Sequence, residues 1–178
     1  ALAHATKANA LQALGQLRDA EDNLRQAITL YPGMAEAHNN LGNALAAQGR
    51  FEEAVTCFRE ALRLDPRSLG IHNNIGNALQ ELSRPVEAIE AYRKAIAGNP
   101  DSAVAWNNLG NALMQQGDFE EAHACYLRAL ALRPDMVSAY DNLLFGACFD
   151  LKIPPEQYLA FARQYAERVT RHVVPFDH

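Results

Sequence analysis

A seven-residue block that returns every 34 residues constrains this chain more than any other feature. It reads NNLGNAL at 39–45, NNIGNAL at 73–79 and NNLGNAL at 107–113. Proline and alanine keep the same period, at Pro32, Pro66, Pro100 and Pro134, at Ala20, Ala54, Ala88 and Ala122, and at Ala27, Ala61, Ala95 and Ala129. A fixed period of this length indicates an array of similar supersecondary units. The sequence therefore predicts four complete units, 1–34, 35–68, 69–102 and 103–136.

Each unit contains the pattern of two helices joined by a short turn. In the third unit we expect helices over 69–82 and 86–97. Gly15, Gly49 and Gly117 mark the turns of the other units, because glycine tolerates the left-handed backbone that ends a helix. Ser83 takes this place in the third unit, and Pro85 after it suits the first turn of a helix. A helical hairpin cannot bury its apolar face alone, so neighbouring hairpins must stack into an α-solenoid.

These residues resemble the tetratricopeptide repeat (TPR) family. Counting from the first residue of each unit, the family prefers an aromatic residue at position 4, Leu at 7, Gly at 8, Ala at 20, an aromatic residue at 24, Ala at 27 and Pro at 32. The fourth unit matches throughout, with Trp106, Leu109, Gly110, Ala122, Tyr126, Ala129 and Pro134. The first unit departs most, with Lys7 and Ala8 at positions 7 and 8. The resemblance implies an all-α, right-handed solenoid of antiparallel hairpins.

Composition excludes several classes of protein. The 178 residues are 49 % apolar and 21 % charged, which is typical of a folded domain, and the net charge is −5. No basic stripe suited to nucleic acid is visible, and no run approaches the ~20 apolar residues of a membrane span. Three widely spaced cysteines, Cys57, Cys125 and Cys148, form no disulfide framework. We therefore expect a cytoplasmic protein with a protein or peptide partner, and neither nucleic acid nor membrane as partner.

Asparagine lines one side of the first helix of each unit. At about 100° per residue, positions 2, 6, 9 and 13 lie opposite positions 4, 7, 11 and 14, which we expect to be buried. Helices disfavour asparagine, so its repetition in register asks for a reason. In a TPR array this side resembles the lining of the concave groove. The predicted groove residues are Asn40, Asn43, Asn74, Asn77, Asn108, Asn111 and Asn142.

Three interpretations of these amides stay open. A carboxamide has two donors and an acceptor, so a ladder of them can bond the backbone of an extended peptide. Alternatively, the amides tie one repeat to the next, or they face water. The first two interpretations are compatible. At position 5, Asn39, Asn73 and Asn107 lie on the flank of the groove, where solvent is as reasonable an environment as a ligand.

Other kinds of site are not supported by the residue spacing. The TPR clamp for chaperone C-termini needs Lys or Arg on the groove side, and none occurs at position 2 or 6. His4, His38 and His72 share the register but lie on the order of 10 Å apart from one another, too far to share a metal, so we assign them to packing. Cys57 and Cys125 are two repeats apart, too far for a disulfide. We predict no catalytic residues, no cofactor, no metal and no enzyme activity for this chain.

The C-terminal region departs from the repeat after a partial fifth unit. Residues 137–178 are expected to contain that partial unit and a capping or linker helix over about 155–172, with Tyr158, Leu159, Ala162, Tyr165, Ala166 and Val169 on its apolar face and Leu143, Leu144 and Phe149 beneath it. The segments NLLF at 142–145, PE at 155–156 and AER at 166–168 resemble the junction in bacterial O-GlcNAc-transferase-like and Spindly-type proteins. That resemblance implies an acceptor-recognition arm of a glycosyltransferase whose catalytic domain lies beyond this chain.

The alternative is a structural or assembly TPR module that contacts a folded partner or itself. The first helix, over about 2–14, should hide Leu11 and Leu14 and has no capping element before it. We therefore expect either disorder in about the first ten residues or a homo-oligomer formed through this N-terminal end.

Overall fold

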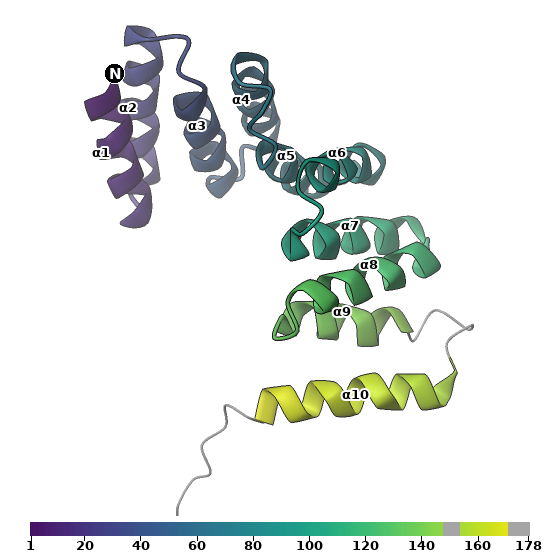
Figure 1. Ribbon diagram of the computed structural model, residues 1–178. Helices are drawn as coiled ribbons and strands as arrows, with labels where there is room; N and C mark the ends of the chain where they lie inside the picture. The colour runs from purple at the N-terminus through teal and green to yellow at the C-terminus, as the bar shows by residue number, and fades with distance from the viewer. Residues whose placement is uncertain (148–153, 171–178) are drawn as a thin grey trace, which may run out of the picture. The chain divides into compact units, whose positions relative to one another are not determined.

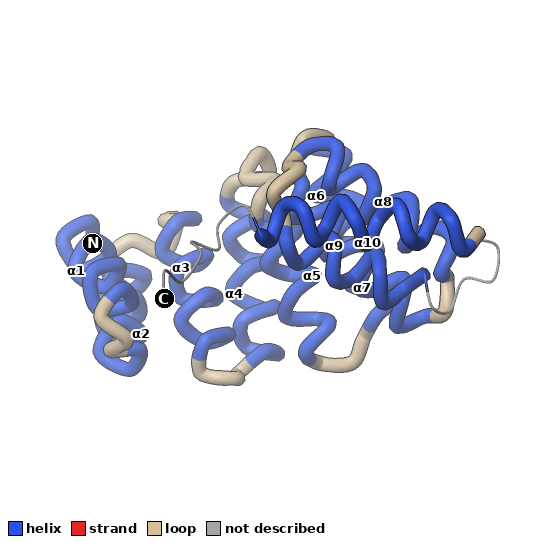
Figure 2. Tube along the Cα trace, turned by 90° about the horizontal axis from the view of Figure 1, so that it is seen from below, coloured by secondary structure: helices blue, strands red, loops and turns tan. Residues whose placement is uncertain are grey.

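The computed structural model describes residues 1–147 and 154–170. Those residues contain ten α-helices. They contain no strand, as the colouring of Figure 2 shows, which confirms the predicted all-α class. The helices are α1 (Leu2–Ala13), α2 (Leu17–Leu30), α3 (Ala35–Ala47), α4 (Phe51–Leu64), α5 (Ile71–Glu81), α6 (Pro85–Gly98), α7 (Ala103–Gln116), α8 (Phe119–Leu132), α9 (Val137–Ala147) and α10 (Pro155–Thr170).

The helices form successive hairpins, α1–α2, α3–α4, α5–α6 and α7–α8, and the two helices of each lie side by side (Figure 1). The chain divides into two compact units, residues 1–99 with α1 to α6 and residues 100–178 with α7 to α10. From here on, the first unit and the second unit are these two parts, and the 34-residue units are called repeats. Within the first unit α2 packs against α3 and α4 against α5, and within the second α8 packs against α9. Within each unit, this stacking of one hairpin on the next element is the arrangement expected of a solenoid.

The hairpin turns use the left-handed backbone at the predicted positions. Gly15, Gly49 and Gly117 have φ values of 74°, 76° and 84°. Ser83 adopts the same conformation, with a φ of 56°, and is the one non-glycine residue with positive φ in the described part of the chain. Pro85 occupies the first turn of α6, as predicted. Ser83 therefore carries a backbone strain that the three glycines avoid.

A glycine at position 8 lets the two helices of a hairpin touch. A Cβ added to Gly42 would lie 2.5 Å from the ring of Phe58, and one added to Gly76 would lie 2.4 Å from the ring of Tyr92. Gly110 stands in the same relation to Tyr126, at 2.5 Å. Because the three rings are buried, they cannot swing away into solvent. In the first hairpin Ala8 takes the glycine position and Leu24 takes the aromatic position, and both are fully buried.

Position 14 was assigned wrongly to the buried stripe. Leu14 is 74 % exposed, because α1 ends at Ala13 and Leu14 is its C-cap. At position 4, two of the rings bond a backbone carbonyl of the preceding turn: His38 Nε2 lies 3.0 Å from the Pro32 oxygen, and Trp106 Nε1 donates to the Pro100 oxygen at 2.8 Å. His4 Nδ1 instead lies 3.1 Å from Asn23 Oδ1. These contacts account for position 4 as a packing position.

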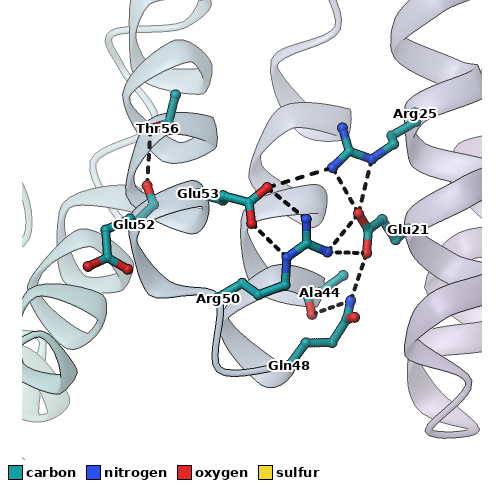
Figure 3. Close-up of polar contacts among 8 residues, drawn as sticks. All are labelled: Glu21, Arg25, Ala44, Gln48, Arg50, Glu52, Glu53 and Thr56. Atoms are coloured by element: carbon teal, nitrogen blue, oxygen red, sulfur yellow. Dashed lines mark hydrogen bonds and ion pairs between the residues drawn. The ribbon is translucent and has the colours of Figure 1, made fainter.

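A network of charged side chains fixes the first hairpin to the second (Figure 3). Both carboxylate oxygens of Glu21 on α2 accept hydrogen bonds from Arg50, at 2.9 and 2.8 Å. Arg25 and Gln48 also donate to this carboxylate, at 2.8 and 3.0 Å, and Arg50 in turn pairs with Glu53. The Glu21 side chain is only 11 % exposed. Burial alone would raise the pKa of Glu21, but the hydrogen bonds from Gln48, Arg25 and Arg50 together lower the pKa from 4.5 to about 2.

The C-terminal helix α10 packs on the second unit, against α9. Its contact with α8 includes the rings of Phe161 and His123, whose centroids are 5.6 Å apart. The predicted apolar face was partly wrong, because Leu159 and Ala166 are exposed while Phe161 is half-buried. Leu143 beneath the helix is fully buried. Cys148, Phe149 and 171–172 lie outside the described residues.

Candidate functional site

The predicted asparagine ladder lies on the first helices of the hairpins. Position 6 supplies Asn40, Asn74, Asn108 and Asn142, and position 9 supplies Asn43, Asn77 and Asn111. All seven side chains are partly or fully exposed. In the first unit they lie on α3 and α5, and in the second on α7 and α9. Their exposure makes them accessible to a ligand.

Position 6 hydrogen-bonds back to the preceding repeat. Asn74 Nδ2 donates to Asn39 Oδ1 and to Asn43 Oδ1, both at 3.3 Å. Asn40 Nδ2 donates to Asn9 Oδ1 at 2.8 Å in the same way. Hydrogen bonds between neighbouring repeats, one of the interpretations left open by the sequence, are therefore present in the first unit.

The same contact occurs in the second unit and alters the assignment of position 5. Asn142 Nδ2 donates to Asn107 Oδ1 at 3.1 Å, and Asn107 is only 4 % exposed. Asn107 is thus a buried acceptor on the side that faces the next repeat, not a flank residue open to solvent. The helical wheel missed this because it treats one helix alone, whereas α9 covers position 5 of α7.

Position 9 accepts from a buried tyrosine of its own hairpin. The Tyr126 hydroxyl donates to Asn111 Oδ1 at 3.0 Å. The Tyr92 hydroxyl lies 2.7 Å from Asn77 Oδ1 and 2.5 Å from Gln80 Oε1, so its one proton is shared between two acceptors. Burial raises the pKa of both hydroxyls above the ordinary value of 10, so each keeps its proton at neutral pH and can donate it. Sequence reasoning missed this pairing, although tyrosine at position 24 accompanies asparagine at position 9 in both the third and the fourth repeat. The second repeat has Phe58 there, and its Asn43 accepts from Asn74 instead.

Two pockets open along the ladder in the first unit, between α3 and α5. One has a volume of about 470 Å³ and is lined by Glu36, Asn39, Asp65 and Asn74 among others. The second has a volume of about 400 Å³, and its lining is Asn43, Ala46, Phe51, Phe58, Asn74, Asn77, Ala78 and Glu81. Asn74 lines both. The ladder is thus flanked by cavities large enough for side chains of a ligand.

The helices that carry the ladder contain no cation. None of α3, α5, α7 and α9 has a Lys or Arg, whereas α3 and α5 contribute Glu36 and Glu81. Neither carboxylate makes a hydrogen bond or ion pair with a described residue. In the first unit this face is therefore acidic and polar. These four helices therefore lack the Lys or Arg side chains that a clamp for chaperone C-termini requires.

Other chemistry is sparse in the described part of the chain. No group of three or more His, Cys, Asp or Glu side chains there could hold a metal ion. Cys57 and Cys125 are both thiols, and burial raises the pKa of Cys57. Among the helices of 1–147 and 154–170, none is long and apolar enough to cross a membrane.

Sequence profiles of the tetratricopeptide repeat match residues 6–69, 86–117 and 103–136. The chain belongs to the tetratricopeptide repeat family. No curated protein matches the sequence.

Solved structures share the fold, two of the following three over nearly the whole chain. MamA from Desulfovibrio magneticus RS-1 is 20 % identical, with a TM-score of 0.84 over 96 % of each chain. YrrB, described as a TPR protein with an unusual peptide-binding site, is 21 % identical, with a TM-score of 0.77 over 95 % of this chain and 86 % of its own. The first TPR of Spaghetti (RPAP3), bound to the HSP90 peptide SRMEEVD, is 26 % identical, with a TM-score of 0.63 over 64 % of this chain and 90 % of its own. These similarities establish this chain as a TPR solenoid of stacked hairpins.

Proposed function

We propose that this TPR chain is a protein-interaction scaffold that binds an extended segment of a partner protein along its asparagine ladder. The observation that carries the proposal is the pair of pockets on either side of Asn74, on a face lined by amides. An amide-lined face can bond peptide backbone with little regard to sequence, while the pockets take side chains.

The contacts between repeats leave part of each amide available. Asn74 and Asn142 use their NH₂ groups toward the preceding repeat, and no described group donates to their carbonyl oxygens. Asn43 has the opposite arrangement: its carbonyl oxygen accepts from Asn74, and its NH₂ group has no acceptor among the described residues. Asn74 and Asn142 can therefore accept a backbone N–H of a ligand, and Asn43 can donate to a backbone C=O. The repeat-to-repeat bonds hold these amides in place for this role.

Two of the similar structures support a peptide ligand by their descriptions. YrrB is described as having a peptide-binding site, and the first TPR of Spaghetti (RPAP3) is bound to a peptide. We propose, more specifically, an acceptor-recognition arm of a cytoplasmic, glycosyltransferase-like protein. This rests on the asparagine ladder and on the junction residues Asn142, Leu143, Leu144 and Phe145. The sequence that follows His178 in the complete protein would test it, since a glycosyltransferase domain is expected there.

A structural or assembly module is the second candidate. Leu2, Leu14, Leu30 and Tyr31, all in the first hairpin or the turn after it, are each at least 60 % exposed. Apolar side chains in such number invite contact with a folded partner or with a second copy of the chain. Light scattering over a range of concentrations would detect the second copy. A mass that stays at 19.6 kDa per particle would contradict self-association.

The test of peptide binding uses ligands selected from a random peptide library displayed on phage. The double variant Asn74→Ala with Asn108→Ala should weaken the selected peptides by about 1–3 kcal/mol, the scale of two hydrogen bonds. The control is Gln26→Ala, which removes an exposed amide from α2. Circular dichroism would verify that both variants fold. Unchanged affinity in the double variant, with folding intact, would exclude the ladder as the binding element.

A further inference from the structure

We propose that the partner segment is basic, and that the two pockets beside Asn74 each take a Lys or Arg side chain. This inference rests on the proposed function, since it assigns the chemistry of the segment that the ladder binds. It is carried by the lining of the pockets and by the distribution of charge over α3 and α5.

The pocket on the C-terminal side of Asn74 combines an aromatic wall with a carboxylate. Its lining includes Phe51, which is half-buried, Phe58, which is buried, and Glu81, which is exposed. A long basic side chain suits this lining, because its methylene stem can pack on aromatic carbon while its charged head stays near the carboxylate. The head meets an aromatic face and a carboxylate, both of which attract a cation. An acidic side chain would face repulsion from Glu81 with no compensating cation on α3 or α5.

The pocket on the N-terminal side carries two carboxylates, from Glu36 and Asp65. Ser68 Oγ donates to Asp65 Oδ2 at 2.7 Å, and this hydrogen bond is the main cause of a lowered pKa for Asp65. Asp65 therefore stays ionised at neutral pH and keeps its orientation. Arg67 lies 3.8 Å from the other Asp65 oxygen, but its side chain is 95 % exposed, so it neutralises the pocket weakly.

The spacing of the pockets sets the spacing of the basic residues. The residues lining the two pockets are centred about five residues apart on α5 and about eight apart on α3, which is about 7.5 and 12 Å at a rise of 1.5 Å per residue. A polyproline II segment places side chains i and i+3 on the same face, about 9.3 Å apart. The fit predicts two basic residues with two others between them, and the backbone between them passes over Asn74.

The test is the composition of peptides selected from a random phage library on the whole chain. We expect Lys or Arg to be enriched at two places three residues apart. For a selected peptide made synthetically, Glu81→Gln or Glu36→Gln should weaken binding about fivefold, the factor that one exposed ion pair of about 1 kcal/mol provides. The matched control, Glu90→Gln, removes an exposed carboxylate from α6 and should leave the affinity unchanged.

The outcomes separate this inference from the proposed function. Peptides that lose affinity in Asn74→Ala but show no basic enrichment, or are indifferent to Glu81→Gln and Glu36→Gln, would overturn the inference and leave peptide binding standing. Enrichment of acidic residues would overturn it as well. Peptides indifferent to Asn74→Ala, or no selected peptide at all, would overturn both.

Discussion

Substitution of Glu21 by Gln should loosen the first hairpin from the second in a pH-dependent way. The Glu21 carboxylate receives four hydrogen bonds from Arg25 and Arg50 and one from Gln48, across the junction of α2 with α3 and α4 (Figure 3). Glutamine keeps the shape of the side chain but removes one of the two carboxylates that the guanidinium groups share, so Glu53 remains as their common counterion. The variant therefore isolates the charge from the packing.

The expected magnitude follows from the pKa of Glu21. The difference between 4.5 and about 2 corresponds to about 3.4 kcal/mol, since a factor of ten in the acid constant is worth about 1.36 kcal/mol. Arg25 is 52 % exposed and Arg50 is 36 % exposed, so solvent screens part of this interaction. We expect Glu21→Gln to lower the free energy of unfolding by about 2 kcal/mol at pH 7.

The direction of the pH dependence is fixed by the same values. Because the pKa of Glu21 is lower in the folded than in the unfolded chain, its stabilisation is present above about pH 4.5 and is lost as the pH falls toward 2. The difference between wild type and variant should therefore shrink over this range. Urea unfolding at a series of pH values would measure it, and hydrogen exchange in α1 and α2 would show whether the first hairpin opens first.

The matched control is Glu60→Gln. The Glu60 carboxylate pairs only within α4, with Arg63 one turn away, and that pair is exposed. Glu60→Gln should therefore lower the free energy of unfolding far less than Glu21→Gln does. A Glu21→Gln variant as stable as wild type at pH 7, or equally destabilised at pH 7 and pH 3, would refute the reasoning.

Three further predictions concern the hairpins and the ladder. Gly76→Ala should lower the free energy of unfolding in urea by about 1–3 kcal/mol, since the new Cβ would lie 2.4 Å from the buried Tyr92 ring. Gly70→Ala, with open space around the added Cβ, should not lower it, and equal effects of the two substitutions would contradict this. Ser83→Gly should raise the free energy of unfolding by about 0.5–1 kcal/mol, because glycine relieves a φ of 56°, and a loss of stability would contradict it. Binding of a selected peptide in which Gln replaces every Lys and Arg should depend weakly on salt, because neutral amides are not screened; a steep loss of affinity at high salt would indicate an ionic mode instead.

The repeat period predicted the hairpins because each one is a local structure. Helices expected at 69–82 and 86–97 are found at Ile71–Glu81 and Pro85–Gly98, and the left-handed turn positions follow from glycine and its substitute Ser83. These features depend on residues close together in the chain. Leu14 was misplaced because the wheel continues a helix past its real end.

Contacts between repeats were harder to predict, since they join residues about one period apart. Glu21 and Arg50 are 29 positions apart, and Asn107 and Asn142 are 35 apart. Nothing in either local pattern indicates that Glu21 is buried among three donors or that Asn107 is covered by α9. The pairing of Asn77 with Tyr92 has a detectable signal, because both residues recur in the next repeat as Asn111 and Tyr126.

The central claim is that the ladder amides bind a ligand, and the side-chain NH₂ resonances of asparagine report this directly. In a ¹⁵N-labelled sample titrated with a selected peptide, the NH₂ signals of Asn43, Asn74 and Asn77 should shift together and saturate at one affinity. The NH₂ signal of Gln26, outside the ladder on α2, should stay in place. Saturating peptide that leaves the ladder amides unshifted while signals elsewhere move would contradict the account.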